Sequence, residues 1–354
     1  MGVNSGVSSP RGPVATLRRI AFLLERGRQE TYKVKAFRTA AASLLPLSDE
    51  EVAARVAAGA LTDLPGIGAS TAKVVAAVVA GEVPERLTSL EEEYGGALVS
   101  GGEGLRAALR GDLHSHSDWS DGGSPIEEMA FTAIELGHDY LVLTDHSPRL
   151  TVAHGLSVER LQRQLGVVDA INDHFAGAGS GGFRLLKGIE VDILDDGSLD
   201  QTDEMLGRLE VRVASVHSKL RMERTAMTRR MVAAVRNDFT NVLGHCTGRL
   251  VRGGRGTRPQ SEFDARAVFE ACAEHDVAVE INSRPERRDP PTDLLQVAID
   301  LGCVFAIDSD SHAPGQLDFV IHGCARAEEL GLDPDRIVNT WPRERLLAWA
   351  AKSV

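Results

Sequence analysis

The 354-residue sequence predicts an α/β fold in which a small all-α domain precedes a distorted, seven-stranded (β/α)7 barrel of the TIM type. From residue 109 onward, seven short apolar runs alternate with stretches of helical spacing, a pattern that indicates a parallel sheet. A histidine, aspartate or glutamate stands at or just after the end of six of these runs. Residues 14–90, in contrast, show helical spacing only.

Composition and terminal segments are those expected of a soluble globular protein of the cytoplasm. Hydrophobic residues make up 43% and charged residues 25% of the chain, and no apolar run is long enough to span a bilayer. Residues 1–13 are polar and rich in Gly and Ser, which predicts a disordered leader rather than a signal peptide. The four cysteines form no C-x-x-C pair, as expected in a reducing compartment.

Charge is distributed unevenly between the two parts. Residues 1–80 contain ten Lys/Arg and six Asp/Glu, a net charge of +4, whereas the remainder contains 29 and 45, a net charge of −16. A basic amino-terminal arm on an acidic protein indicates a division of labour between the two parts.

The helical domain contains a candidate DNA-binding turn. Leu64-Pro65-Gly66-Ile67-Gly68 separates two predicted helices, the second over residues 70–80. Two glycines around one apolar residue permit a tight turn whose amides can meet a phosphate at a helix amino terminus. The pattern is typical of a helix-hairpin-helix that reads the DNA backbone; a plain inter-helix turn, with a solvated basic face beside it, is the alternative. The candidate DNA-binding residues are Lys33, Lys35, Arg38, Gly66, Ile67 and Gly68.

The first barrel strand is expected in the short apolar run that His114 and His116 close, and the others near residues 140–144, 183–189, 211–216, 241–244, 277–281 and 304–307. Barrel active sites lie at the carboxyl ends of the strands. His114 and His116 at positions i and i+2 of the first run place both rings on one side of the backbone. Imidazole and carboxylate groups suit a borderline divalent metal. Five other histidines fall elsewhere and are expected to be structural: His138, His154, His174, His275 and His322. For His154 alone among them, a functional role stays open.

The motifs H-S-H-S-D-W-S-D-G, T-D-H-S-P-R-L, G-I-E-V-D-I-L, S-V-H-S, G-H-C-T-G-R, E-I-N-S-R-P and D-S-D-S-H resemble those of a PHP (polymerase and histidinol phosphatase) domain. The version is most similar to the one at the carboxyl end of bacterial family X DNA polymerases. The resemblance implies three divalent metal ions (Mn, Zn or Fe): one at His114, His116, Glu190 and Asp310, a second at Glu190, His217 and His245, and a third at Asp121, His146 and His312.

The helical domain resembles the amino-terminal DNA-binding domain of the same polymerases, through Tyr32 to Arg38 and L-P-G-I-G. Some members carry a Schiff-base lysine there for deoxyribose-phosphate removal. The matching position here is Val74, with Lys73 one residue away, so no lyase activity is expected. Residues 91–108, rich in Glu and Gly, are expected to be a linker, which leaves no room for a polymerase core before the domain at 109–354.

A loop with four arginines follows His245. Gly and Pro indicate a loop, and its position at the metal rim favours phosphate recognition by planar, bidentate guanidinium groups. A solvated, mobile loop is the alternative reading. The candidate phosphate-binding residues are Arg249, Arg252, Arg255 and Arg258.

Together these features predict a metal-dependent phosphoesterase that acts on DNA by attack of a metal-activated hydroxide on phosphorus. The expected activity is that of a 3′–5′ exonuclease, which could extend to abasic endonuclease or 3′-phosphatase activity, with Glu190, His217 and Asp310 as catalytic residues. A replication or repair partner could supply polymerase activity. The alternatives are a small-molecule phosphatase of the histidinol-phosphate or nucleotide type, and a non-catalytic DNA-binding scaffold.

Overall fold

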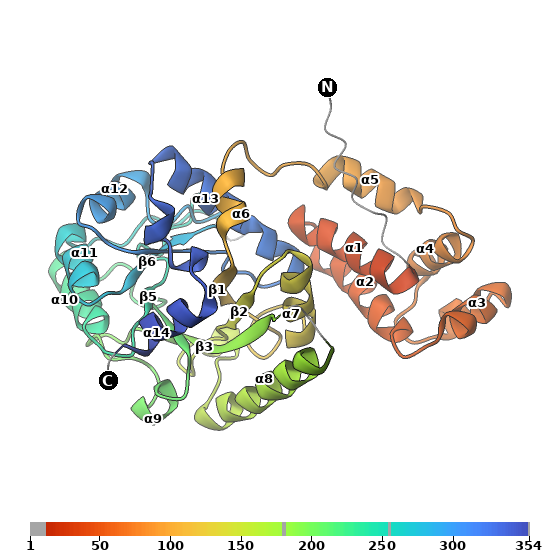
Figure 1. Cartoon of the computed structure of the whole chain (residues 1–354), viewed down its shortest axis with the longest axis horizontal. Coiled ribbons are helices and arrows are strands. Elements are labelled where there is room, and N and C mark those ends of the chain that lie inside the picture. The colour runs from red at the N-terminus through yellow and green to blue at the C-terminus, as the bar shows by residue number, and fades with distance from the viewer. Residues whose placement is uncertain (1–11, 179–181, 254–255, 353–354) are drawn as a thin grey trace. The chain divides into compact units, whose positions relative to one another are not determined.

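The computed structural model describes residues 12–178, 182–253 and 256–352 (Figure 1). Contacts between residues divide the chain into two compact units, Met1–Leu98 and Val99–Val354. None of the helices in these ranges is long and apolar enough to cross a membrane.

The first unit is all-helical, as its periodicity predicts. It comprises α1 (Pro13–Arg26), α2 (Thr31–Leu44), α3 (Asp49–Ala57), the short 3-10 helix η1 (Leu61–Asp63), α4 (Ala69–Val79) and α5 (Glu85–Tyr94). Helix α1 begins at a proline, which has no amide hydrogen to leave unpaired in the first turn. Its buried face contains Leu17, Ile20 and Leu24, and it packs against α2, α4 and α5. The apolar stripe of α1 is therefore the core of this unit.

The ends of this unit differ in part from the sequence-based expectation. Residues 1–11 of the predicted leader lie outside the described residues, and α1 already begins at Pro13. The expected linker, 91–108, includes the end of α5 and all of α6 (Glu103–Ala108). The glycines of this stretch led to the prediction of a linker instead of α6. Leu105 of this helix is buried, and the Glu328 carboxylate accepts hydrogen bonds of 2.8 Å from the amides of Gly102 and Leu105.

The second unit is a seven-stranded parallel barrel that is nearly closed, which confirms the predicted fold class. The strands pair in chain order: β1 (Gly111–Ser115), β2 (Tyr140–Leu143), β3 (Arg184–Asp192), β4 (Val211–Ser215), β5 (Val242–Leu243), β6 (Ala278–Asn282) and β7 (Phe305–Asp308). Between β1 and β7 an isolated bridge joins Ser115 to Ser311, and the His116 amide donates to the Ser311 carbonyl at 2.8 Å. The strands are almost wholly buried, which explains their continuous apolar runs.

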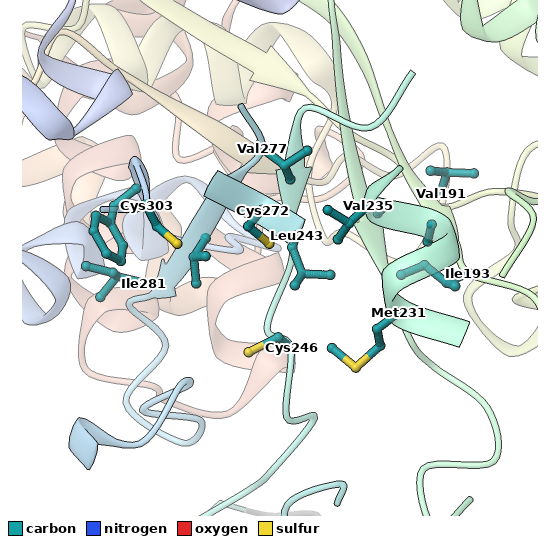
Figure 2. Packing of buried hydrophobic residues seen from close by; sticks show 14 of the residues in the cluster. Val191, Ile193, Met231, Val235, Leu243, Cys246, Cys272, Val277, Ile281 and Cys303 are labelled. Atoms are coloured by element: carbon teal, nitrogen blue, oxygen red, sulfur yellow. The ribbon is translucent and has the colours of Figure 1, made fainter. Parts of the chain in front are cut away.

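Helices follow the strands and cover the barrel. They are α7 (Ile126–Glu135), α8 (Val158–Ala178), α9 (Asp203–Leu206), α10 (Arg224–Val235), α11 (Ala265–Glu274), α12 (Thr292–Asp300), α13 (Val320–Glu329) and α14 (Arg343–Ala351), with 3-10 turns η2 (Thr151–Ala153), η3 (Pro314–Phe319), η4 (Pro334–Arg336) and η5 (Val338–Thr340). One apolar cluster lies between the strands and the helices α10 to α13. Figure 2 shows that Cys246, Cys272 and Cys303 are part of its packing. All four cysteines are buried and unpaired by disulfides.

A second apolar cluster lies at the amino-terminal end of the barrel. The first residues of three strands, Tyr140, Val211 and Val242, pack there with two tryptophans. Trp341 lies just before α14, and Trp349 lies within it. This end of the barrel is therefore filled with apolar side chains, and the polar residues gather at the opposite, carboxyl-terminal end.

Candidate metal centre

The nine predicted metal ligands converge at the carboxyl ends of the strands. Glu190 lies within β3 rather than beyond its end, because β3 continues to Asp192. The strand-end positions follow from parallel topology, in which all carboxyl ends meet at one rim. His114 lies in β1 and Glu190 in β3, six others come one to four residues after the end of a strand, and Asp121 comes from the turn after β1.

Glu190 is the centre of the cluster. Its Oε2 lies 3.3 Å from His114 Nε2, 3.5 Å from His116 Nε2 and 2.9 Å from His146 Nδ1. Its Oε1 lies 3.2 Å from His217 Nε2 and 2.8 Å from His245 Nε2. The two oxygens of one carboxylate therefore face two different sets of imidazoles, as a bridging ligand requires.

Two further contacts extend the cluster. His116 Nε2 also lies 3.5 Å from Asp310 Oδ1. Asp121 Oδ1 lies 3.4 Å from His146 Nε2 and 3.3 Å from His312 Nε2. Ligand atoms within 4.8 Å of one another form three groups among the described residues: His116, Asp121, His146 and His312; His114, His116 and Glu190; and His146, Glu190 and His217. The groups share members, so the candidate ligand atoms form one continuous cluster.

The donor atoms fit divalent metal ions. Within the described chain, both ring nitrogens of His116, Nε2 of His114 and both Glu190 oxygens are buried without a hydrogen-bond partner. Buried polar atoms are normally satisfied, so this concentration of unpaired imidazole and carboxylate atoms indicates ligation. Imidazole and carboxylate donors suit Zn, Mn and Fe.

Burial and charge act together on the ionisation of the cluster. Burial raises the pKa of Glu190, but the histidines His217, His114 and His146 outweigh it and hold the pKa well below its ordinary value. Burial, together with charge on His312 and His146, lowers the pKa of His116 to about 3. Glu190 is thus an anion and His116 a neutral imidazole, the forms that ligate a cation.

Carboxylates outside the ligand set orient the imidazoles, and the sequence reading did not identify them. Glu280 Oε1 lies 2.6 Å from His114 Nδ1, and Asp192 is in contact with His217 Nδ1. Such outer partners fix the ring and its tautomer and raise its basicity toward a metal. A charged residue in the middle of the buried run Ala278–Asn282 was the available signal for Glu280.

The arginine loop is folded against the rim, and only part of it faces the site. Arg249 is turned away, with its Nε 3.1 Å from the carbonyls of Arg287 and Arg288. Arg252 and Arg258 line the site, although each also donates to a backbone carbonyl, of Pro285 at 3.1 Å and of Gly248 at 2.6 Å. The fourth predicted residue, Arg255, lies outside the described residues.

Two other arginines at the rim, Arg284 and Arg287, went unrecognised in the sequence. Arg287 Nε lies 3.0 Å from Asp310 Oδ2, and Arg284 Nη1 lies 3.0 Å from His312 Nδ1. Burial raises the pKa of Asp310, but Arg287 and Arg284 outweigh it and hold that pKa well below its ordinary value. Both follow β6 and border the metal ligands, so they are better placed for a phosphate than Arg249.

A cleft of about 770 Å³ opens over the cluster. Its floor includes Asp121, His146, His217, Asp310 and His312, and its rim carries the four arginines 252, 258, 284 and 287. A cleft of this size accommodates ligands larger than a phosphate ion.

The candidate DNA-binding residues of the helical unit have different surroundings from one another. Lys35 is exposed and Lys33 half-buried. Arg38 is held by the buried Glu25, with Nη2 at 2.7 Å from Oε2, so its guanidinium stabilises the unit. In the predicted turn, Gly66 has a φ of +82°, and a Cβ there would lie 2.5 Å from Thr39 Cγ2, which explains the glycine.

The amides of that turn are partly used within the protein. The Ile67 amide donates to the Leu64 carbonyl at 3.2 Å and the Gly68 amide to Thr71 Oγ1 at 3.0 Å. Val74, at the position of the family X lysine, is buried, and Lys73 is exposed. A phosphate therefore reaches the amides of Ile67 and Gly68 only if it displaces these bonds.

Residues 112–284 match the PHP domain family, and residues 12–82 match a helix-hairpin-helix domain. The chain is 36% identical over 231 residues to the DNA polymerase/3′-5′ exonuclease PolX of Bacillus subtilis, a match that covers 65% of this chain and 39% of that protein. It is 26% identical over 246 residues to the probable phosphatase YcdX of Escherichia coli, covering 66% of this chain and 91% of YcdX.

Among solved structures, the histidinol phosphate phosphatase of Lactococcus lactis, described as complexed with zinc, L-histidinol and phosphate, is similar with a TM-score of 0.46 and 18% identity, covering 64% of this chain and 95% of that one. The two curated relatives are named as a 3′-5′ exonuclease and a probable phosphatase, both of which are activities on phosphoester bonds. The chain spans 39% of the length of the Bacillus relative. Two separate matches, one in each unit, therefore identify the domains of this chain: residues 12–82 belong to a helix-hairpin-helix domain and residues 112–284 to a PHP domain.

Proposed function

We propose that the protein is a metal-dependent phosphoesterase that hydrolyses DNA from its 3′ end. The observation that carries the proposal is the convergence of nine histidine and carboxylate ligands around Glu190, beneath a cleft rimmed by arginines. The match to a 3′-5′ exonuclease and the helix-hairpin-helix domain support DNA as the substrate. Activity at abasic sites or on 3′-phosphates would use the same centre.

The ligands divide into three sets that share a rim. His114, His116, Glu190 and Asp310 would hold one ion, Glu190, His217 and His245 a second, and Asp121, His146 and His312 a third. Bound divalent ions would supply an activated water and neutralise the charge on the phosphate oxygens. Manganese, zinc and iron all suit this donor set.

The protein's own groups have distinct tasks. Arg252, Arg258, Arg284 and Arg287 would bind the non-bridging oxygens of the scissile phosphate, since guanidinium groups match phosphate geometry. Glu190, His217 and Asp310 would stand closest to the reacting phosphorus. Glu280 and Asp192 keep the imidazoles of His114 and His217 in place.

A small-molecule phosphatase is the second candidate, because YcdX, a probable phosphatase, matches the barrel over 91% of its own length. The helical unit counts against it, since a small metabolite needs no reader of the DNA backbone.

One comparison tests the proposal. The purified chain, treated with a chelator and then with Mn²⁺, Zn²⁺ or Fe²⁺, is assayed on 3′-labelled DNA and on histidinol phosphate. We expect chelation to abolish DNA hydrolysis and metal to restore it. His116→Ala should remove activity, whereas His174→Ala, on the exposed surface of α8, should not. Preferred hydrolysis of histidinol phosphate would favour the second candidate, and an active His116→Ala variant would contradict the proposed centre.

A further inference from the structure

The cleft over the metal cluster has an apolar wall that metal and phosphate chemistry do not use. Leu150, Val152 and Ala153 from the loop between β2 and α8, with Leu250 from the loop between β5 and α11, line it. The side chain of Val152 is 87% exposed. An apolar side chain so exposed at the mouth of a polar cleft requires an explanation, because exposed apolar surface at such a place marks a binding site.

The loop that presents Val152 is firmly built. Its ends are joined by the hydrogen bond from the Leu156 amide to the His146 carbonyl, at 2.7 Å, and by that from the Gly155 amide to the Leu150 carbonyl, at 3.2 Å. A Cβ at Gly155 would lie 1.8 Å from the Ser147 carbonyl oxygen, so the loop closes more tightly than any other residue permits.

Side chains from outside the loop hold it as well. The Arg149 amide donates to Asp200 Oδ2 at 2.6 Å, and Arg160 Nη1 donates to the His154 carbonyl at 2.5 Å. Ala153 and Leu156 are buried beneath the loop. Val152 is therefore exposed because the fixed backbone points it away from the core.

The other residues that line the cleft indicate the ligand. Arg252 and Arg258 lie on the same loop as Leu250, Arg284 and Arg287 lie on the loop after β6, and five ligands of the metal cluster line the cleft as well. A ligand that fits this lining carries a phosphate and, next to it, an apolar group. The volume of about 770 Å³ is larger than a phosphate ion needs and within the range for ligands of nucleotide size.

We propose that the wall formed by Leu150, Val152 and Leu250 holds the base of the nucleotide whose phosphate lies over the metal ligands, so that the site selects DNA ends that carry a base. The inference rests on the proposed function, in that it places a DNA end in this cleft. The wall provides apolar contact with no donor or acceptor pattern, which gives preference for a base without preference for its identity.

The test compares two DNA ends that differ in the base alone. One oligonucleotide ends in a normal 3′ nucleotide and the other in a tetrahydrofuran abasic analogue. The full chain, loaded with metal, should have a KM about tenfold lower for the first, the value expected for burial of one aliphatic side chain against the base. Val152→Ser should remove this difference by raising the KM for the normal end. The kcat for both ends and the KM for the abasic end should stay unchanged.

Two further variants sharpen the result. Val251→Ser is the matched control. Val251 is a valine that is 40% exposed on the loop between β5 and α11, and it is not among the described residues that line the cleft. It should leave both substrates unchanged. Val152→Phe should lower the KM for the normal end further, since an aromatic ring stacks on a base.

A binding measurement separates failure of this inference from failure of the proposed function. Calorimetry compares deoxyadenosine monophosphate with deoxyribose 5-phosphate, and the wild type should prefer the former by a margin that Val152→Ser abolishes. Equal hydrolysis of both DNA ends and equal binding of both ligands would overturn the inference and leave the DNA hydrolase standing. Preference for the mononucleotide without any DNA hydrolysis would support the base wall and overturn the proposed function. Absence of both would overturn both.

Discussion

At the scale of single residues, Glu190 unites the site because each of its oxygens faces a different set of histidines. A carboxylate 1% exposed would ordinarily pick up a proton, but the surrounding imidazoles keep it ionised. Burial would be costly for an isolated carboxylate, but among these imidazoles Glu190 keeps its negative charge at the position where cations would bind. Asp310 is likewise a buried carboxylate, and Arg287 and Arg284 hold its pKa well below its ordinary value against the effect of burial. Its φ of +50° also places a non-glycine residue in a strained conformation at the candidate site.

His138 is a buried histidine that metal chemistry does not explain. It follows α7, is 4% exposed, and neither ring nitrogen has a hydrogen-bond partner among the described residues. Burial, and to a lesser extent Arg106, lowers its pKa from 6.5 to about 3. The folded protein therefore holds the neutral ring, while the unfolded chain takes up a proton below pH 6.5.

This difference predicts an acid-sensitive contribution to stability. Because the unfolded state binds the extra proton, stability from His138 is complete above pH 6.5 and is lost as pH falls toward 3. At pH 5 the loss should be about 2 kcal/mol. Thermal unfolding of the metal-saturated protein at pH 7 and pH 5 should show a smaller pH effect in His138→Leu than in wild type. His174→Leu, an exposed control, should behave as wild type; an equal pH effect in His138→Leu would contradict the assignment.

At the scale of elements, side chains join β1 to β7 where the ladder is incomplete. Asp308 Oδ1 accepts the Leu113 amide at 2.9 Å, and Asp112 Oδ2 accepts the Ser309 amide at 3.2 Å. Asn339, fully buried in η5, accepts from the Ile307 amide at 2.7 Å and donates to Gly111, Ile307 and Asp308. These bonds replace a strand pairing at the position where four metal ligands are delivered.

Asn339→Ala should therefore damage both the barrel and the metal centre. Leaving the Ile307 amide and its neighbours unsatisfied should cost about 3 kcal/mol, or roughly 6–12 °C in Tm for a unit of this size. Bound metal should also fall, since His114, His116, Asp310 and His312 depend on this junction. Calorimetry and elemental analysis measure the two effects. Thr340→Ala, which loses only partly exposed hydrogen bonds, is the control, and an unchanged Tm in Asn339→Ala would show that the junction is not needed.

How far the sequence predicted the molecule depended on the range of the interaction. The seven strands were predictable because each is a short apolar run that ends at a polar residue of the rim, a pattern visible within about ten residues. The meeting of the candidate ligands at one rim was predictable for the same reason, and their role as metal ligands stays a prediction. Glu280 and Asp192 were missed because their role depends on His114 and His217, which lie 166 and 25 residues away.

Arginines show the same limit. Arg249 was expected at the phosphate but its side chain binds backbone carbonyls, while Arg284 and Arg287, in the stretch after β6, border the ligands. Likewise, Arg38 was expected on DNA and is instead paired with Glu25. Charge in a sequence indicates what a residue can bind, and the fold decides which partner reaches it first.

At the scale of the whole molecule, the two units differ in charge: residues 1–98 have a net charge of 0, with 11 Lys/Arg and 11 Asp/Glu, and residues 99–354 have a net charge of −12, with 28 and 40. The helical unit has exposed cations, and the barrel holds the candidate centre for hydrolysis. If the helical unit binds DNA, binding and hydrolysis should be separable by experiment, because no predicted ligand of the metal centre belongs to residues 1–98.

The final prediction uses this separation. Lys33→Ala with Lys35→Ala should weaken DNA binding and reduce the slope of log K against log salt by about 1.4 to 1.8, since each lost phosphate contact removes about 0.7 to 0.9. Hydrolysis of a small phosphodiester should stay unchanged, because the metal ligands are untouched. Arg236→Ala with Arg345→Ala, exposed cations outside the helical unit, removes the same charge and should leave the slope as it is.

A fragment of residues 99–354 extends the test to the whole helical unit. It should retain metal content and small-substrate turnover while losing affinity for DNA and most of the salt dependence. Retention of full affinity and slope by both the fragment and the double-lysine variant would show that the helical unit does not read DNA. The barrel alone would then determine the substrate, and the small-molecule phosphatase would become the better account of this protein, because the match to YcdX needs only the barrel.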